Sequence, residues 1–418
     1  MKVIFIIFLF FLPAYLFPYI LVPMDNSQAN HLKAYGLAFK ALQSGIRVKW
    51  LLNYRGGSFC IISDSKEIIN WAVTRNITYE TITEEQFGAI QQFIEHENMN
   101  IVNLDSAPRI AVYAPPWNAP WDDAVTLALQ YAEIPYSTIW DKEVMSGLLT
   151  TENFDWIHLH HEDFTGQHGK FWFGYAHEKW YIERSILFEK TAREVGFSSV
   201  QEEKKAVALK IREYVINGGF LFAMCAATDT LDIALSSIGI DIIPPEIDGT
   251  PVDETVNSKL NFEMTFAFEN FNINTNPYVY EFSDIDVDVM EESINFTPFY
   301  FKLNEFSAKY DTIPTMLVQN HNNYIKGFLG QTTGFHVEKI KKDVTLLNTI
   351  EGRNWVTYIH GDRGKGTFTF LGGHDPEDYA HKVGEPPTNL DLFPNSSGYR
   401  LILNNVLFPA AKTKQRKT

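Results

Sequence analysis

One cysteine of this chain lies where the sequence predicts a sharp turn between a strand and a helix. Two glycines at 218–219 precede the apolar run 220–224, Cys225 follows directly, and a helical pattern comes next. A nucleophile in such a turn is held above the sheet edge in a strained conformation, and only small neighbours such as Ala223 and Ala227 fit beside it. The pattern favours a reactive thiol. The alternative is a buried cysteine that acts only as a small apolar side chain.

A histidine late in the chain is the base that such a thiol needs. Residues 356–360 and 367–370 alternate like the strands of a hairpin, and the second strand leads into His374. A cysteine nucleophile uses an imidazole to hold its proton and an acid to orient that imidazole. We therefore expect His374 to be the base, with Glu377 as the orienting acid and Asp375 as the second choice.

Another polar stretch follows the predicted strand 154–159. His160, His161 and Glu162 come directly after this strand. The carboxyl ends of parallel strands meet at one edge of a doubly wound sheet, so a strand order of 2-1-3-4 places these residues across a crevice from the cysteine. We expect them to line the opposite wall and to recognise the substrate, while the backbone N–H of Ala226 binds an oxyanion.

The same stretch supports a metal-dependent hydrolase as an alternative. The cluster from His158 to Asp163, together with His374, offers imidazoles and carboxylates that Zn²⁺ or another divalent ion accepts. Side chains alternate along a strand, so we expect His158 and His160 on one face and His161 on the opposite face. At most two of these three imidazoles would then converge. The principal interpretation assigns no metal and no cofactor.

The spacing of apolar residues predicts an α/β protein with several lobes. Residues 19–107 alternate strands and helices and are expected to form an N-terminal α/β lobe. Residues 108–239 and 351–411 carry the strand–helix series that contains the cysteine and the late hairpin, which predicts a flavodoxin-like, doubly wound, mainly parallel sheet. Prolines and alternating aromatic residues in 240–350 predict a β-rich insertion.

Charge and the two ends of the chain restrict the class of protein. The 418 residues carry a formal net charge of −16, which argues against a nucleic-acid-binding protein. Residues 1–18 combine a charged start, an apolar run and a proline, the pattern of a secretory signal peptide. We expect an exported protein, periplasmic or secreted, that meets a membrane only if this segment stays uncleaved. The basic run 412–418 is expected to be a solvated tail.

The chain has only two cysteines, Cys60 and Cys225. An oxidising compartment would permit a disulfide between them, and such a bond would end the catalytic interpretation. Cys60 lies in the predicted strand of a different lobe, which favours two separate thiols.

The order of Cys225 and His374 resembles that of the class I glutamine amidotransferase-like superfamily. The resemblance covers roughly 108–240 and 355–410. It implies a flavodoxin-like fold and a Cys-His-Glu triad that opens amides through a thioester. The superfamily has Glu two residues after His, whereas this chain has Pro376 at that place.

The whole chain is also similar to exported bacterial proteins catalogued as asparagine synthetase B. The stretches that carry this similarity are 19–25, 53–59, 158–166, 222–225, 372–378 and 401–409. Glutamine-dependent asparagine synthetases have Cys directly after the initiator Met, where this chain has Lys2, and a Ser-Gly-Gly-x-Asp-Ser loop that this sequence lacks. We therefore expect hydrolysis of an amide or ester through an acyl-thioester, and not ATP-dependent synthesis.

A third interpretation is a secreted binding or assembly module without catalysis. Aromatic residues at 171–175 and 180–181 suit stacking on a sugar, although aromatic core packing explains the same residues. The expected partner is a small molecule, a peptide or a sugar. The oligomeric state is left open by the sequence.

Overall fold

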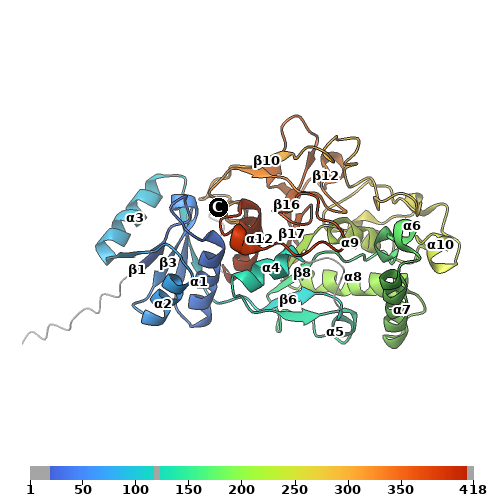
Figure 1. Cartoon of the computed structure of the whole chain (residues 1–418), viewed down its shortest axis with the longest axis horizontal. Coiled ribbons are helices and arrows are strands. Elements are labelled where there is room, and N and C mark those ends of the chain that lie inside the picture. The colour runs from blue at the N-terminus through green and yellow to red at the C-terminus, as the bar shows by residue number, and fades with distance from the viewer. Residues whose placement is uncertain (1–18, 117–122, 412–418) are drawn as a thin grey trace, which may run out of the picture.

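The computed structural model of the protein describes residues 19–116 and 123–411 (Figure 1). The predicted signal peptide 1–18 and the predicted basic tail 412–418 lie outside the described residues. A smaller N-terminal lobe packs beside a larger body, and each is built on its own sheet.

The N-terminal lobe contains a five-stranded antiparallel sheet in the order β4-β1-β3-β2-β5. Its strands are β1 (Tyr19–Val22), β2 (Val48–Leu52), β3 (Ser58–Ile62), β4 (Glu80–Ile82) and β5 (Asn100–Leu104). Its helical segments are α1 (His31–Gln43), the 3-10 turn η1 (Tyr54–Gly56), α2 (Lys66–Thr74) and α3 (Glu84–His96). Alternate residues of each strand face opposite sides, so α1 packs on Val22 and Trp50 while α3 packs on Leu21 and Cys60.

The larger body is built on a seven-stranded sheet in the order β13-β16-β17-β9-β8-β6-β7. Its strands are β6 (Ile110–Tyr113), β7 (Ser137–Ile139), β8 (Trp156–Leu159), β9 (Phe220–Met224), β13 (Thr345–Leu346), β16 (Tyr358–Arg363) and β17 (Gly366–Leu371). The run from β7 to β17 is parallel, and β16 and β13 add antiparallel strands at one edge. The fold is therefore mixed α/β. The predicted hairpin is present as β16–β17, and β8 and β9 are neighbours as the sequence indicates.

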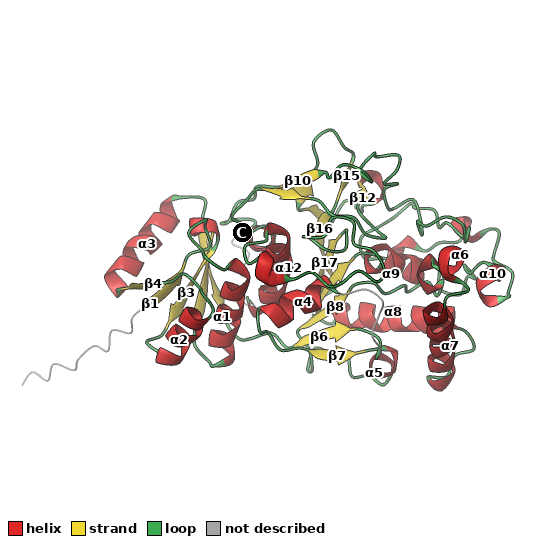
Figure 2. Ribbon diagram, in the orientation of Figure 1, coloured by secondary structure: helices red, strands yellow, loops and turns green. Residues whose placement is uncertain are grey.

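Helices cover both faces of this sheet (Figure 2). Val112, Trp156 and Phe222 share one core cluster with α4 and α12, whereas Ile157 and Leu221 share another with α8 and α9. The helices of the larger body are α4 (Ala124–Tyr131), α5 (Asp141–Met145), α6 (Trp172–Tyr175), α7 (Lys179–Glu194), α8 (Val200–Ile216), α9 (Ala227–Ser236), α10 (Pro245–Asp248), α11 (Thr312–Leu317) and α12 (Ser397–Leu407). Burial on both faces is the reason that the central strands β6 and β9 are wholly apolar and that β8 and β17 are mainly so.

The segment 240–350 contains less β-structure than the sequence predicts. Apart from β13, which joins the large sheet, its strands are β10 (Tyr300–Leu303), β11 (Tyr324–Lys326), β12 (Phe335–His336) and β14 (Asn348–Thr349). Strand β15 (Trp355–Val356), which follows this segment, pairs with β12. They form a three-stranded sheet, β11-β10-β14, and a two-stranded pair, β12-β15. Residues 240–299 are mainly turns and loops (Figure 2). Asn, Asp and Pro residues satisfy turns locally there, which shortens the strands.

Short 3-10 turns complete the chain. They are η2 (His168–Lys170), η3 (Val256–Ser258), η4 (Phe262–Met264), η5 (Val337–Lys339), η6 (Leu390–Leu392) and η7 (Phe408–Ala410). Among the helices of the described ranges, none combines the length and apolarity that a membrane crossing requires.

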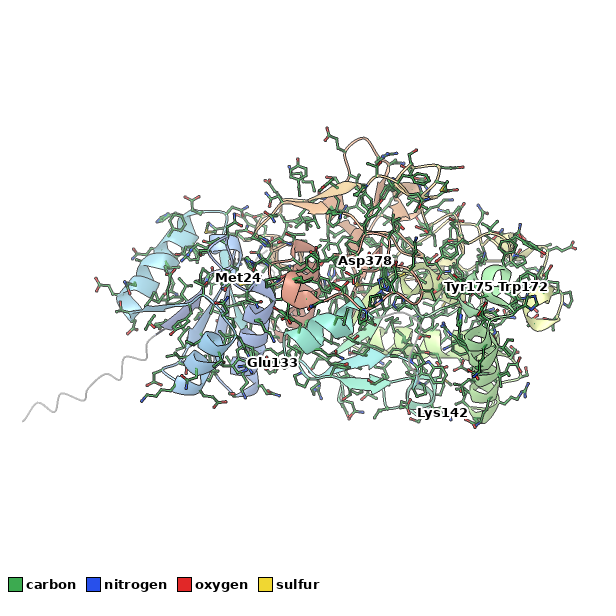
Figure 3. The ribbon with its side chains drawn as sticks, in the orientation of Figure 1. Met24, Glu133, Lys142, Trp172, Tyr175 and Asp378 are labelled. Atoms are coloured by element: carbon green, nitrogen blue, oxygen red, sulfur yellow. The ribbon has the colours of Figure 1, made fainter. Side chains whose placement is uncertain are left out.

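The two lobes share one hydrophobic core and a set of buried polar contacts. The fully buried guanidinium of Arg400 on α12 donates to the carbonyls of Met24 (3.0 Å) and Gly56 (2.8 Å) in the N-terminal lobe. On the outer side of the junction, Glu133 pairs with Lys33 and Arg75 of that lobe (Figure 3). Buried charge-assisted hydrogen bonds fix the orientation of the lobes more firmly than exposed ion pairs do.

Candidate functional site

Cys225 lies directly between the end of β9 and the start of α9. Its backbone has φ = 52°, a left-handed conformation that costs a non-glycine residue on the order of 1 kcal/mol or more. The flanking Ala223, Ala226 and Ala227 are all buried, so larger side chains would not fit there. The predicted strand–turn–helix geometry is therefore present, and it presents the thiol at the carboxyl end of the sheet.

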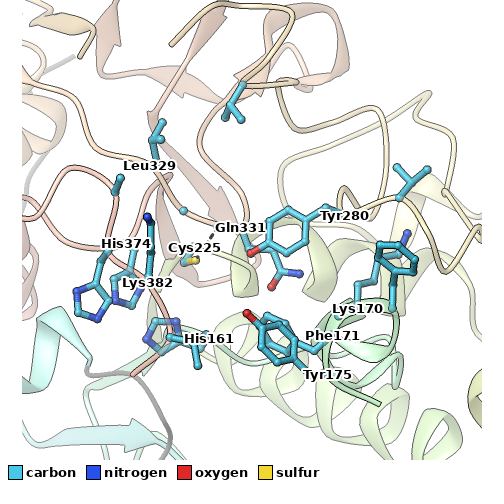
Figure 4. A pocket seen from close by; sticks show the side chains of 18 of the residues that line it. His161, Lys170, Phe171, Tyr175, Cys225, Tyr280, Leu329, Gln331, His374 and Lys382 are labelled. Atoms are coloured by element: carbon cyan, nitrogen blue, oxygen red, sulfur yellow. Dashed lines mark hydrogen bonds between the residues drawn. The ribbon is translucent and has the colours of Figure 1, made fainter. Parts of the chain in front are cut away.

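Three histidines surround this thiol. Each of Cys225, His160, His161 and His374 offers one sulfur or ring nitrogen atom, and these four atoms all lie within 4.8 Å of one another. Figure 4 shows His161 and His374 beside the sulfur. Because β8 and β17 flank β9 in parallel, the residues that follow all three strands meet at one edge.

The expected alternation along the third strand is wrong beyond its last residue. Strand β8 ends at Leu159, so His160 and His161 belong to the following turn. Their rings stack at a centroid distance of 3.8 Å, and both lie near His374, at 4.9 and 4.3 Å. His160 and His161 converge on His374, whereas His158 lies on the other side of His160, at a ring-centroid distance of 5.7 Å.

Asp123 is a site residue that the sequence reasoning missed. It is the N-cap of α4 and follows the first parallel strand, so it reaches the same sheet edge. Its carboxylate lies 3.1 Å from Nε2 of His158 and 3.2 Å from Nδ1 of His160. Burial opposes ionisation of Asp123, but the two imidazoles hold its pKa well below the usual range. Burial also lowers the pKa of His160 to about 4, so its ring is neutral at pH 7. The sequence did contain one signal for this residue, namely an aspartate between the first parallel strand and the helix that follows it.

The two acids expected to orient His374 are engaged elsewhere. The buried carboxylate of Asp375 accepts hydrogen bonds from the backbone N–H of Glu377 (2.8 Å) and from the hydroxyls of Thr388 (2.7 Å) and Tyr399 (3.0 Å). Glu377 hydrogen-bonds to Ser396 and lines a separate depression. The turn after His374 directs both carboxylates toward α12, which explains why sequence adjacency misled the prediction.

Glu162, expected to recognise substrate, does not line the cavity beside Cys225. Its buried carboxylate lies 3.8 Å from the ammonium of Lys204, which also binds Asp141 at 2.9 Å. Burial raises the pKa of Glu162, and Lys204 opposes that rise. The chain turns after His161, so this carboxylate enters the core beneath α8.

Cys225 forms part of the floor of a cavity of about 650 Å³ (Figure 4). Aromatic side chains dominate the lining: Phe171, Phe173, Tyr175, Tyr278 and Tyr280. Its basic and imidazole-bearing lining residues are His161, Lys170, His374, His381 and Lys382. None of the described residues that line it is an aspartate or a glutamate, although the chain carries 51 of them. The cavity is large enough for a small organic molecule or a peptide side chain.

Hydrogen-bond donors surround the sulfur and the adjacent space. The backbone N–H of Gln331 donates to Sγ of Cys225 at 3.4 Å. The N–H of Ala227 donates to the carbonyl of His160, whereas that of Ala226 has no hydrogen-bond acceptor among the described residues. Ala226 is the N-cap of α9, whose positive end favours a negative charge nearby. The expected oxyanion donor at Ala226 is therefore available.

Gln331 and Tyr280 come from the insertion and were not identified from sequence. Two buried acids hold the loop that carries Gln331: Asp229 accepts from the hydroxyl of Thr332 (2.8 Å), and Asp286 accepts from the N–H of Thr333 (2.9 Å). Desolvation at the cavity wall and the neighbouring Cys225 raise the pKa of Tyr280. A loop without periodicity gives no sequence signal for such contacts.

No disulfide joins the two cysteines. Cys60 and Cys225 are both free and buried, and they belong to different lobes. Burial raises the pKa of Cys60 to about 12, which makes its thiol unreactive.

Comparisons with known proteins do not assign this site. No family model matches the sequence, and no curated protein matches it. Among solved structures, the Salmonella typhimurium cytoplasmic protein STM3548 is 12% identical with a TM-score of 0.35, over 72% of this chain and 97% of that protein. The cytoplasmic protein STM1381 of the same organism is 12% identical with a TM-score of 0.36, over 73% and 100%. Gan42B, a GH42 beta-galactosidase, is 10% identical with a TM-score of 0.28, and the match spans 65% of this chain and 28% of the enzyme. Structural similarity this low identifies neither a family nor an activity.

Proposed function

We propose that this protein is a cysteine-dependent hydrolase that opens an amide or ester through an acyl-thioester on Cys225. One observation carries the proposal. Cys225 stands in a left-handed turn at the end of β9, on the floor of a cavity, with a ring nitrogen of His374 within 4.8 Å. A strained turn, a nearby base and an enclosed space are the features that a thiol nucleophile requires.

The reaction proceeds in two steps. The sulfur of Cys225, after giving its proton to His374, attacks the substrate carbonyl, and a C–S bond forms. The C–N or C–O bond then breaks as His374 returns the proton to the leaving group. Water, deprotonated by His374, attacks the thioester next, which releases the carboxylic acid and restores the thiol. The N–H of Ala226 stabilises the oxyanion in both steps.

We propose Cys225 and His374 as the catalytic pair. Asp375 and Glu377 serve the turn and the neighbouring depression, as described above. His160 and His161 lie against His374; His161 lines the cavity, whereas His160 is not among its described lining residues. We propose that His161 and the aromatic wall select the substrate, a small molecule or a short peptide or sugar.

We further propose that the central sheet is of the flavodoxin-like class and that the domain resembles class I glutamine amidotransferases. The parallel strands run in the order β7-β6-β8-β9-β17, which is 2-1-3-4-5 when counted along the chain from β6. The cysteine after the fourth strand and the histidine after the fifth support this resemblance. Export remains part of the proposal and rests on residues 1–18 alone.

Selective alkylation tests the nucleophile. With a pKa of about 12, Cys60 has a thiolate fraction of about 10⁻⁵ at pH 7, and its side chain is fully buried. We expect iodoacetamide to label Cys225 at least about 100-fold faster than Cys60, as measured by peptide mass spectrometry at pH 7. Cys60→Ser should keep the fast labelling, and Cys225→Ser should lose it.

Acyl-enzyme formation tests the chemistry. p-Nitrophenyl acetate should give a burst of nitrophenol and an acetyl group on Cys225, and Cys225→Ser should give neither. Equal, slow labelling of both cysteines together with no burst would overturn the proposal. That result would favour the binding-module alternative, which the exposed aromatic residues Phe173 (66% exposed) and Tyr278 (58% exposed) of the cavity wall support.

A further inference from the structure

We propose that His160, His161, His374 and Cys225 together bind one thiophilic divalent metal ion of the Zn²⁺ class, and that the bound ion silences the thiol. Metal binding itself is independent of the hydrolase proposal, whereas the silencing rests on it. The four side chains come from the ends of three adjacent parallel strands, so the fold brings them together before any metal arrives.

The donor atoms are close to the spacing that such an ion needs. Zn²⁺ is bound at about 2.0–2.1 Å by imidazole nitrogen and about 2.3 Å by thiolate, so tetrahedral donors lie roughly 3.3–3.6 Å apart. In the protein these donors all lie within 4.8 Å of one another. Small side-chain rotations bring them to bonding distance. The stacked rings of His160 and His161, now 3.8 Å apart, must separate in that movement.

Asp123 prepares one of the ligands. Its carboxylate lies 3.2 Å from Nδ1 of His160, close enough to pair with the ring electrostatically. Both ring nitrogens of His160 are buried, and neither has a hydrogen-bond partner of normal geometry among the described residues. A carboxylate behind a histidine whose other nitrogen is unsatisfied is the usual support for a metal-bound imidazole. This observation is independent of the clustering of the four donors.

The ligand set predicts what the ion does. Three neutral imidazoles and one thiolate occupy all four positions of a tetrahedral ion, so no position remains for an activated water. Binding converts the Cys225 thiol to a metal thiolate and releases one proton, with no change of oxidation state. The nucleophile and its base are then both held by the metal. The ion therefore acts as a reversible inhibitor and not as a catalyst.

Cobalt titration of the full chain tests the site without an activity assay. Co²⁺ substitutes for Zn²⁺, and a Co²⁺–thiolate bond gives a ligand-to-metal charge-transfer absorption in the near ultraviolet. We expect this band to saturate at one equivalent and to disappear on addition of Zn²⁺. Cys60→Ser should retain the band, whereas Cys225→Ser should lose it. Circular dichroism confirms that each variant is folded.

A second variant tests the role of Asp123. Asp123→Asn keeps all four ligands and should weaken Co²⁺ binding by about 10–100-fold. Two other groups of possible metal ligands contain no sulfur, so Co²⁺ bound at either gives no thiolate band. They are Asp123 with His158 and His160, and Asp378 with His381 and Glu385. Absence of the band in the unmodified protein, or a band of equal strength in Cys225→Ser, would refute the inference. Fast alkylation of Cys225 that Zn²⁺ does not slow would refute the silencing while leaving the hydrolase proposal intact.

Discussion

Replacing Asp229 with asparagine should stabilise the protein at neutral and alkaline pH. The side chain of Asp229 is fully buried in the first turn of α9, and its Oδ1 accepts a hydrogen bond from Thr332. Burial raises the pKa of this carboxyl from 3.8 to about 7, despite the opposing hydrogen bond from Thr332. The folded protein therefore binds this proton more tightly than the unfolded chain does.

The sign and the magnitude follow from that difference. The stability contributed by the protonated carboxyl is fully present below pH 3.8 and is lost as the pH rises toward 7. Each pKa unit corresponds to about 1.4 kcal/mol, so ionisation costs the fold on the order of 4 kcal/mol at pH 8 and less than about 2 kcal/mol at pH 5. Asparagine keeps the Oδ1 acceptor for Thr332 and carries no charge. Asp229→Asn should remove this cost.

Urea unfolding, followed by tryptophan fluorescence at pH 5 and pH 8, measures the effect. Asp232, one turn later in α9, is the matched control because its carboxylate accepts from the N–H groups of Phe266 (2.6 Å), Ala267 (2.7 Å) and Phe268 (3.0 Å). An asparagine at 232 cannot satisfy all three donors, so Asp232→Asn should destabilise at both pH values. The reasoning fails if Asp229→Asn is no more stable than the unmodified protein at pH 8, or if its advantage is the same at pH 5.

Three further outcomes test the lobe junction, the packing and the proposed base. Arg400→Met should lower the free energy of unfolding by about 3 kcal/mol or more, because four hydrogen-bond partners, two buried and two partly buried, lose their donor. Denaturant titration measures this, and a loss below about 1 kcal/mol contradicts it. Gly366→Ala should destabilise the protein by more than about 2 kcal/mol, because the added Cβ would lie 2.1 Å from a backbone oxygen. Gly88→Ala, in a helix with open space around it, should instead stabilise the protein by about 0.5–1 kcal/mol. Equal melting temperatures of the two variants would contradict both expectations. His374→Gln should slow release of the acetyl group from the enzyme by about 10²–10⁴-fold in a stopped-flow assay, and the exposed control His177→Gln should leave that rate unchanged.

Local patterns sufficed for the strands and helices around the thiol, although they predicted more β-structure in 240–350 than the structure contains. Small residues around Cys225 and the helical period after it predict the strand–turn–helix, because the steric demands of that turn act within a few residues. The hairpin that leads to His374 was predictable from sequence for the same reason, because the alternation of apolar and polar residues along a strand is a local property. The parallel neighbours of Cys225 follow from general rules of α/β topology.

The assignment of individual polar side chains was less successful, because the direction of a side chain beyond a strand end depends on the turn that follows. Sequence adjacency suggested that Asp375 and Glu377 serve His374, but the turn directs both toward α12. It likewise suggested that Glu162 faces the substrate, whereas its carboxylate pairs with Lys204.

The sequence by itself determined an α/β chain whose cysteine and histidine each follow a buried strand, since period and composition encode which residues enter a core. Only the tertiary structure decided that Asp123, Gln331 and Tyr280 join them. These residues lie far apart along the chain: Gln331 contacts the sulfur, Tyr280 lines the same cavity, and Asp123 contacts His160. Loop paths are set by distant contacts such as Asp229 with Thr332, and no local residue pattern records those contacts.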